Sequence, residues 1–251
     1  PRTVSRGLEI QPIFLGLDSL YLVIEYPHID VFRFWSSFIA DGYDKHLYDG
    51  VPIEDMLIRR GGLGYKLSVW LGDARLFITD RVDDALSGTN HDGHGMGLML
   101  QLGPKWLCTH PDISSTESLS QGICNLLNHF KVPNPQDYKI RINRIDIALD
   151  VIGLPMNKFS VDEWRTGWVG RASGKKFYDD AQTGQLPGLT IGSSQGAVRF
   201  KIYDKLLQSV KDKDSLFWFS VWDYEWTIEN MSEVSVTRFE WSIFPHKAKF
   251  V

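Results

Sequence analysis

The sequence predicts an α+β fold with a mostly antiparallel central sheet and helices on one face of it. Three stretches of the second half alternate apolar and polar residues at period two, the pattern of strands with one buried face. They are RINRIDIALDV, AVRFKIYDK and VTRFEWSIF, at residues 141–151, 197–205 and 236–244. Strands and helices recur in both halves, and the connection lengths favour antiparallel pairing. We therefore expect two similar α+β halves that share one sheet, residues 1–110 and residues 111–251, the second of which carries these three strands.

The first half contains strand and helix patterns in alternation. A β-branched and aromatic run predicts a strand at residues 19–26, and an aromatic-rich helical stretch follows at residues 29–39. Two further strands, residues 65–71 and 74–79, are joined by Gly72 and Asp73, a two-residue turn of the hairpin type. A last strand is expected at residues 96–102, before Gly103 and Pro104.

The second half begins with a predicted helix from about Ser114 to Phe130, because Ser114 and Glu117 form a capping box before apolar residues at helical spacing. The first of the three strands follows. The stretch at residues 188–205 predicts a pair of strands, and a helix begins near Leu206. Residues 217–226 are ambiguous, since their alternation favours a strand while Trp218, Trp222 and Trp226 recur at helical spacing.

Composition excludes several classes of protein. The chain of 251 residues has a formal net charge of -4, which argues against a non-specific coat on nucleic acid but leaves room for a local basic groove. It has no run of about 18 apolar residues and no signal segment, so we expect neither a membrane span nor secretion. Cys108 and Cys124 suit a reduced, cytoplasmic protein. The chain begins at Pro1 without Met, and we expect it to be trimmed.

The strand at residues 197–205 carries a tyrosine among cations. Tyr203 shares a strand face with Arg199 and Lys201, while apolar residues fill the other face. Cations on the same face favour the phenolate form, which a tyrosine nucleophile needs in order to attack a phosphodiester. The alternative is an amphipathic tyrosine at the edge of a sheet.

The other two strands each carry an acid two positions after an arginine, as Arg144-x-Asp146 and Arg238-x-Glu240. If the strands are neighbours, Asp146 and Glu240 can converge on one divalent ion, and their hard oxygen ligands suit Mg²⁺ or Mn²⁺. The alternative is a ladder of cross-strand salt bridges, worth about 0.2 to 1 kcal/mol per pair. Asp150 lies roughly 13 Å along the strand from Asp146, so it binds through water, orients a partner or caps the strand end.

Two other groups of polar residues are weaker candidates. His91 and His94 lie three positions apart in a glycine-rich stretch and could hold a metal, although such a stretch is more often a turn. Arg59, Arg60 and Lys66 form one of several basic clusters. Clusters of this kind usually form solvated surface.

The ordered set RIDIALD, GLTIGSSQGAVRFKIYDK and TRFEWSI resembles the replication-initiation family of rolling-circle plasmids and filamentous phages, which includes relaxases of some integrative conjugative elements. The resemblance covers about residues 141–244, with a weaker echo in GLDSLYLVIEY and GMGLMLQLGPKW. It implies a domain like that of the HUH-related nicking enzymes. It also implies a metal-dependent DNA endonuclease and strand transferase, whose tyrosine forms a covalent 5′-phosphotyrosine and frees a 3′-hydroxyl.

Carried over by motif, the resemblance makes Tyr203 the nucleophile, Asp146 and Glu240 the main ligands of Mg²⁺ or Mn²⁺, and Asp150 a supporting acid. The basic residues of the chain that would act on the DNA fall into two groups. Those that would steady the phosphate and the leaving charge are Arg199, Lys201 and Lys205; those that would bind DNA are Arg144, Arg238, Arg171, Lys175 and Lys176.

The implied partners are single-stranded or extruded-hairpin origin DNA, a host helicase and a second copy of the chain. Three functions stay open on the sequence. The first is a nicking and joining enzyme for replication initiation or conjugative transfer, and the second is a DNA-binding relative that does not cut. The third is an unrelated α+β protein that binds a small molecule or a partner. Core packing is the expected use of most of the tryptophans, although base stacking is an alternative.

Overall fold

The computed structural model describes twelve segments of the chain: residues 10–25, 29–40, 47–48, 51–52, 56–60, 65–79, 98–109, 115–156, 174–178, 188–193, 195–224 and 234–247. The chain divides into two compact units. Unit 1 comprises Pro1–Asp18 and Ile145–Val251, and unit 2 comprises Ser19–Arg144. The fold is α+β, and every strand pairing given below is antiparallel, as predicted.

The division between the units differs from the expected one at residues 110 and 111. Strand β1 (Gln11–Glu25) and strand β8 (Lys139–Ile152) each contribute residues to both units. These strands have 15 and 14 residues, well above the common length of about 5 to 6. Unit 1 therefore combines a strand segment from the first 18 residues with strands that follow residue 144, which periodicity alone cannot reveal.

Unit 2 contains strands β4 (Met56–Arg60), β5 (Leu67–Leu71), β6 (Ala74–Ile78) and β7 (Leu98–Leu102), in the hydrogen-bonded order β4-β5-β6-β7-β1. The turn between β5 and β6 is the predicted Gly72-Asp73 pair, and Gly72 has a φ of 57°, which suits glycine. Strands β2 (Leu47–Tyr48) and β3 (Val51–Pro52) form a separate ladder.

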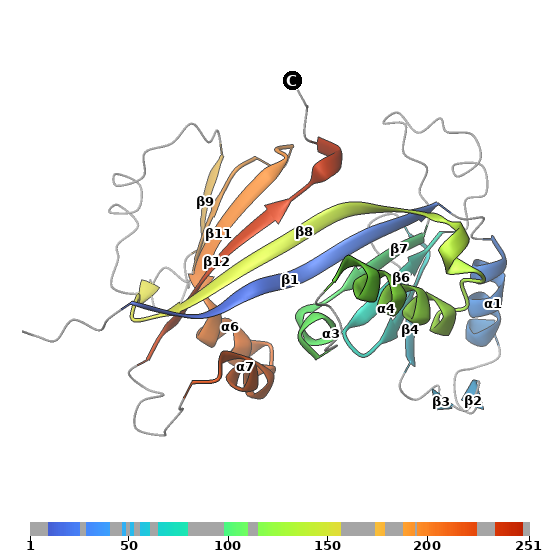
Figure 1. The fold of residues 1–251 in the computed structure, drawn as a ribbon, viewed down its shortest axis with the longest axis horizontal. Helices are drawn as coiled ribbons and strands as arrows, with labels where there is room; N and C mark the ends of the chain where they lie inside the picture. The colour runs from blue at the N-terminus through green and yellow to red at the C-terminus, as the bar shows by residue number, and fades with distance from the viewer. Residues whose placement is uncertain are drawn as a thin grey trace, which may run out of the picture. The chain divides into compact units, whose positions relative to one another are not determined.

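Helices α1 (Ile29–Ala40), α3 (Pro104–Thr109) and α4 (Thr116–His129) accompany this sheet, with a short 3₁₀ helix, η2, at Pro135–Asp137. Figure 1 shows α3 and α4 close to the strands of unit 2. The core includes the fully buried Val69, Leu76 and Leu100 from neighbouring strands. Trp35 of α1 donates a hydrogen bond from Nε1 to the carbonyl of Phe130, at 2.9 Å, which ties α1 to the end of α4.

The predicted helix α4 forms, but its cap lies one residue further on. Ser115 is the N-cap and makes a reciprocal capping box with Ser118, whereas the sequence suggested Ser114 with Glu117. Ser114 lies outside the described residues. Serine hydroxyls can make both capping hydrogen bonds at this spacing, so the motif does not require the glutamate.

Unit 1 contains β9 (Lys175–Tyr178), β10 (Gly188–Ile191), β11 (Val198–Asp204) and β12 (Val236–Ile243), in the order β8-β12-β11-β10-β9. The three strands that the sequence singled out are thus direct neighbours in the sheet. A 3₁₀ helix, η4, follows at Pro245–Lys247.

Two helices, α6 (Lys205–Lys211) and α7 (Ser215–Trp222), pack on unit 1 beside β12 (Figure 1). The ambiguous aromatic stretch is therefore helical in its described part. Trp218 and Trp222 are fully buried and cluster with Ile152 and Val236 at the ends of β8 and β12. This confirms core packing as the use of these two tryptophans.

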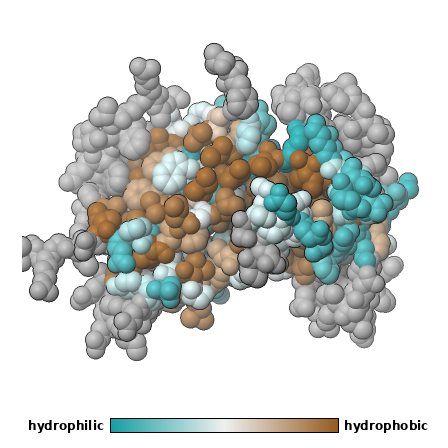
Figure 2. Space-filling model, viewed as in Figure 1, coloured by the Kyte–Doolittle hydropathy of each residue, from teal (hydrophilic) through white to brown (hydrophobic). Residues whose placement is uncertain are grey.

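The opposite face of the unit 1 sheet is apolar. Ile202 is buried there with Met156, and Phe200 and Phe239 pack against them. Figure 2 shows hydrophobic residues gathered over the region where β8, β11 and β12 lie in Figure 1. The polar residues of the three strands therefore share the other face, as the alternation predicts. Among the described residues, no helix is long and apolar enough to span a membrane.

Candidate metal and tyrosine site

The strand register places the predicted polar residues side by side on one face of unit 1. Lys201 of β11 pairs with Glu240 of β12, and Tyr203 pairs with Arg238. Arg238 in turn pairs with Asp150 of β8. Directly paired residues in an antiparallel ladder point to the same face, so these three strands build one polar surface.

Glu240 lies at the centre of this surface. Tyr203 donates a hydrogen bond from Oη to Oε2 of Glu240 at 2.9 Å, and Nζ of Lys201 lies 2.6 Å from Oε1. Glu240 is only 3% exposed, and Tyr203 is half-buried. The nucleophile candidate and a carboxylate from the neighbouring strand therefore meet directly.

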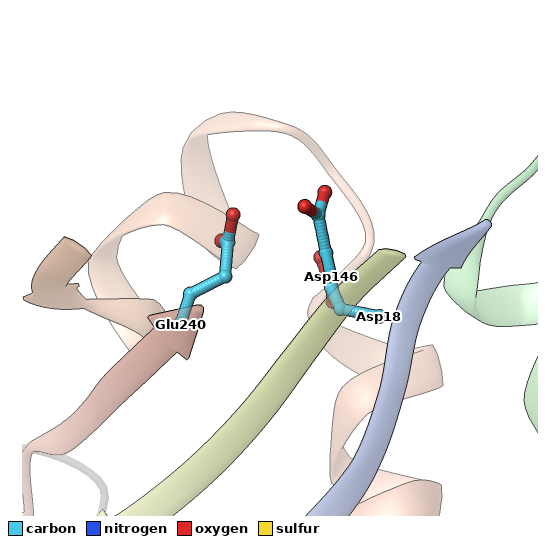
Figure 3. Close-up of side chains that lie close together, drawn as sticks. All are labelled: Asp18, Asp146 and Glu240. Carbon is cyan, nitrogen blue, oxygen red and sulfur yellow. The ribbon is translucent and has the colours of Figure 1, made fainter. Parts of the chain in front are cut away.

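A cluster of three carboxylates surrounds this contact. Asp18, Asp146 and Glu240 each offer an oxygen, and these oxygens lie within 4.8 Å of one another. Figure 3 shows that Asp146 and Glu240 project in the same direction from neighbouring strands. Three converging carboxylates give the hard oxygen donors that Mg²⁺ and Mn²⁺ prefer. A carboxylate oxygen that accepts one hydrogen bond keeps a lone pair, so the contacts to Glu240 still allow coordination.

Asp18 is the member of the cluster that sequence reasoning missed. The predicted first strand began at Ser19, whereas β1 starts at Gln11 and carries Asp18 in its interior. Gly16 interrupts the apolar stretch from Ile13 to Leu17 just before Asp18 and hides the continuation of the strand. The available signal was an acid close to the start of the GLDSLYLVIEY motif.

Asp150 does not belong to the cluster. Its Oδ1 accepts a hydrogen bond from Nε of Arg238, and its Oδ2 accepts one from a terminal nitrogen of the same guanidinium, both at 2.6 Å. Nε1 of Trp222 donates to Oδ2 as well, at 2.7 Å. Of the alternatives left open by the sequence, the structure fits an acid that orients a partner, and it corrects the assignment of Asp150 as a metal ligand.

Arg238 bridges the carboxylates of Asp18 and Asp150. It is fully buried, pairs with Asp18 as well as Asp150, and lies over the ring of Trp218 at 4.0 Å. Burial alone would lower the pKa of Arg238, but the hydrogen bonds and charges of its two acids raise it above the usual value. A side chain with no exposed surface cannot touch DNA, so the predicted DNA-binding role of Arg238 is wrong.

The cluster carboxylates have opposite electrostatic environments. Burial raises the pKa of Asp18, although the charge of Arg238 opposes this. Burial would also raise the pKa of Glu240, but the charge of Lys201 and the hydrogen bonds from Lys201 and Tyr203 lower it overall. Glu240 is therefore ionised at neutral pH and can accept hydrogen bonds or coordinate a cation.

The phenol of Tyr203 is stabilised in its neutral form. Burial raises its pKa well above the usual value, and the negative charge of Glu240 raises it further. The sequence suggested the opposite, because the cations on the strand were expected to favour the phenolate. The physical reason is the burial of the phenol together with the neighbouring Glu240 carboxylate, which outweigh the opposing charge of Arg238 and so keep the pKa of Tyr203 high.

Two of the residues expected to contact the phosphate, Lys205 and Arg199, make other contacts instead. Lys205 is buried, bonds Oε1 of Gln208 at 3.0 Å and lies 4.3 Å from the ring of Trp218. Arg199 lies over Phe244 at 4.7 Å. Lys201 is thus the expected phosphate-contacting cation that the structure places beside Glu240.

The predicted DNA-binding residues are dispersed. Lys176 is exposed on β9, and Arg144 lies over the ring of Tyr21 at 4.8 Å in unit 2. Arg171 and the side chain of Lys175 lie outside the described part of the chain. His91 and His94 lie outside it too.

Gly188 on β10 fixes the position of Tyr203 from the other side. The two residues are register partners, and a Cβ on Gly188 would lie 2.9 Å from the Cβ of Tyr203 and 3.0 Å from the carbonyl oxygen of Ile202. Real Cβ atoms do not approach this closely. The absence of a side chain at Gly188 therefore allows β10 to pack directly beside the tyrosine.

No family model matches the chain, and no curated protein matches it. Among solved structures, the chain is similar to a rolling circle replication initiator protein from Geobacillus stearothermophilus. The sequence identity is 13% and the TM-score is 0.46, and the match covers 94% of this chain and 75% of that chain. Likeness at this level establishes neither a family nor a function for this chain.

Proposed function

We propose that the chain is a metal-dependent DNA nicking and joining enzyme that starts rolling-circle replication. The observation that carries the proposal is the hydrogen bond from Tyr203 to Glu240 inside a cluster of three carboxylates. A nucleophile, a proton acceptor and a set of hard oxygen ligands in contact are the parts that phosphodiester transfer requires. The sequence resemblance to replication initiators supports the same chemistry.

Each residue has a distinct task in this proposal. Tyr203 attacks the phosphorus of a single-stranded DNA phosphodiester, and its proton passes to Oε2 of Glu240. The new bond from Tyr203 to phosphorus replaces the bond to the 3′ oxygen, which leaves as a hydroxyl after taking a proton from solvent. Nζ of Lys201 contacts the carboxylate of Glu240 and offers positive charge to the phosphate. The reverse reaction rejoins the strand.

Asp18, Asp146 and Glu240 are the residues that would hold Mg²⁺ or Mn²⁺. When bound, such an ion supplies Lewis-acid polarisation of the phosphoryl oxygens. The raised pKa of Tyr203 fits a nucleophile that stays protonated until substrate is in place, because a neutral phenol is a weak nucleophile. Arg238 and Asp150 touch no substrate in this scheme and act by positioning Asp18.

Origin DNA, single-stranded or extruded as a hairpin, is the proposed substrate, and a helicase and a second copy of the chain are proposed partners. A relaxase for conjugative transfer would use the same residues, so it is the second candidate. A relative that binds DNA without cutting is disfavoured by the contact between Tyr203 and Glu240, since binding alone does not need it.

The test is covalent attachment. Labelled single-stranded oligonucleotides of random sequence are incubated with the protein and Mn²⁺ or Mg²⁺, and adducts are separated on a denaturing gel. We expect an adduct with the native chain and none with Tyr203→Phe, which keeps the ring but lacks the nucleophilic oxygen.

Tyr138→Phe is the matched control, since this tyrosine belongs to unit 2. It should form adducts at the native level. An adduct that persists in Tyr203→Phe would show that another residue is the nucleophile, and unchanged cleavage in excess chelator would refute the role of the ion.

A further inference from the structure

One face of the unit 2 sheet carries arginine and aromatic side chains in two adjacent rows. Across the strands, Trp70 pairs with Arg75, Arg75 with Gln101 and Gln101 with Tyr21. The next row pairs Arg59 with Ser68 and Ser68 with Phe77. Paired residues share a face, and the opposite face holds the buried core residues Val69, Leu76 and Leu100.

The guanidinium groups of this face stack on its rings. Arg75 lies over Trp70 at 4.3 Å and over Phe77 at 4.0 Å, and Arg59 lies over Trp70 at 5.9 Å. Arg144 covers the ring of Tyr21. These contacts hold the guanidinium groups against aromatic rings, so the arginine and aromatic face (Tyr21, Arg59, Trp70, Arg75 and Arg144) is preorganised.

Two donors on this face lack a hydrogen-bond partner among the described residues. They are Nε1 of Trp70 and Nε of Arg75, both buried. Arg75 instead donates a hydrogen bond from a terminal nitrogen to Oγ of Ser68, at 3.2 Å. A buried donor without an acceptor costs about 1 to 3 kcal/mol, so an acceptor brought close to these two groups would stabilise this face.

The charges of the face favour an anion. Arg59 is exposed and close enough to Arg75 for their like charges to repel: burial lowers the pKa of Arg75, and the charge of Arg59 lowers it further. A phosphate between the two guanidinium groups would relieve this repulsion.

We propose that the arginine and aromatic face of unit 2 binds single-stranded DNA, with phosphates on Arg59 and Arg75 and bases on the exposed parts of the rings and guanidinium planes. This inference rests on the proposed function, since it takes DNA as the ligand. Single strands are favoured over duplex because unpaired bases can stack on aromatic rings and arginine planes. Arg59, which the sequence placed in a basic cluster, thereby gains a task distinct from that of the tyrosine site.

The test is binding of fluorescein-labelled oligo(dT) by the full chain, measured by fluorescence anisotropy over a range of salt concentrations. The variants are Arg59→Gln, which changes an exposed side chain, and the double variant with Arg75→Gln. Arg33→Gln is the control, because Arg33 is 73% exposed on α1 and pairs with Asp30. The Arg33→Gln substitution also removes one positive charge from unit 2, at a residue outside the arginine and aromatic face.

We expect the double variant to bind oligo(dT) at least about tenfold more weakly. The slope of log affinity against log salt should fall by about 1.4, or about 0.7 for each lost phosphate contact. Arg59→Gln alone should lower the slope by about half of that, and Arg33→Gln should match the native chain. An Arg59→Gln protein whose slope and affinity equal those of Arg33→Gln overturns the proposal. Equal weakening of duplex binding overturns the assignment to single strands.

Failure of this inference can be told apart from failure of the proposed function. At saturating DNA, the Arg59 and Arg75 variants should still form the covalent adduct, because Tyr203 is intact. Tyr203→Phe should still bind oligo(dT) with the native salt slope. Loss of adduct without loss of binding would therefore locate the fault at the tyrosine site.

Discussion

Arg238 and Asp150 face each other across β12 and β8 through two hydrogen bonds of 2.6 Å, and neither side chain has any exposed surface. The fork of the guanidinium matches both oxygens of the carboxylate. Its remaining terminal nitrogen reaches Asp18. The pair therefore connects α7, through Trp222, to a member of the carboxylate cluster.

Removing one partner of this pair should destabilise the chain strongly. Asp150→Leu leaves the Arg238 charge buried with Asp18 as its remaining acid, and a broken buried pair costs about 3 to 5 kcal/mol. Urea unfolding of the two proteins in chelator measures the difference. The double variant Asp150→Leu with Arg238→Met should recover part of the loss, because it removes both charges. A single variant as stable as the native chain would contradict the buried pair.

Divalent ions should stabilise the native chain through the carboxylate cluster. Binding to the folded state alone raises stability by RT ln(1 + [L]/Kd), about 2.7 kcal/mol at 100 times Kd. Thermal melts with increasing Mn²⁺ should therefore shift upward, and chelator should reverse the shift. Asp146→Asn removes one ligand and should reduce the shift.

Asp204→Asn is the control for the metal experiment. Asp204 caps α6 by accepting a hydrogen bond from the backbone of Leu207, and asparagine can also serve as an N-cap. This variant should retain the native Mn²⁺ shift. A native melt that does not respond to Mn²⁺ would exclude a metal site of useful affinity in the cluster.

Acid should remove the stability that Glu240 contributes. The folded pKa of Glu240 lies below its ordinary value of 4.5, so between the two values the unfolded chain binds more protons than the folded chain. The free energy of unfolding must then fall as the pH decreases through this window. The difference between the native chain and Glu240→Gln should be complete above about pH 4.5 and should shrink at lower pH. Urea unfolding at a series of pH values in chelator measures it, and a difference that grows in acid would contradict the sign.

A methyl group on Gly188 should displace Tyr203. Gly188→Ala places a Cβ 2.9 Å from the Cβ of Tyr203, so either β10 or the tyrosine must move. We expect covalent attachment to fall by about tenfold or more, since misplacement by about 1 Å can cost a hundredfold. Gly196→Ala is the control, because its nearest described atoms are 3.4 Å away or more. Native attachment by Gly188→Ala would show that the contact does not position the nucleophile.

Much of the site could be predicted because alternation assigns residues to faces. The pattern at residues 197–205 and 236–244 placed Tyr203 and Glu240 on polar faces, and pairing of the strands brings them together. Alternation does not say which polar residues are buried, because it treats a face covered by helices and a face in solvent alike. The resemblance therefore predicts a DNA contact at Arg238, although Trp218 of α7 packs against its guanidinium group.

Other errors have equally local causes. The helix α7 was ambiguous because Trp218, Trp222 and Trp226 are spaced by four, which satisfies both the period of a strand and the turn of a helix. The protonation state of Tyr203 depends on its burial and on the Glu240 carboxylate of β12, and the pattern of β11 alone shows neither. Asp18 was missed because the pattern of β1 is interrupted at Gly16.

The carboxylate cluster joins residues from opposite ends of the sequence, since Asp18 and its partner Arg238 are 220 positions apart. Synthesis of the chain therefore delivers Asp18 well before Glu240. A nascent chain carries Tyr203 for some time without the carboxylate that accepts its proton. On the proposed function, Tyr203 therefore gains its proton acceptor only after β12 is made and paired with β11.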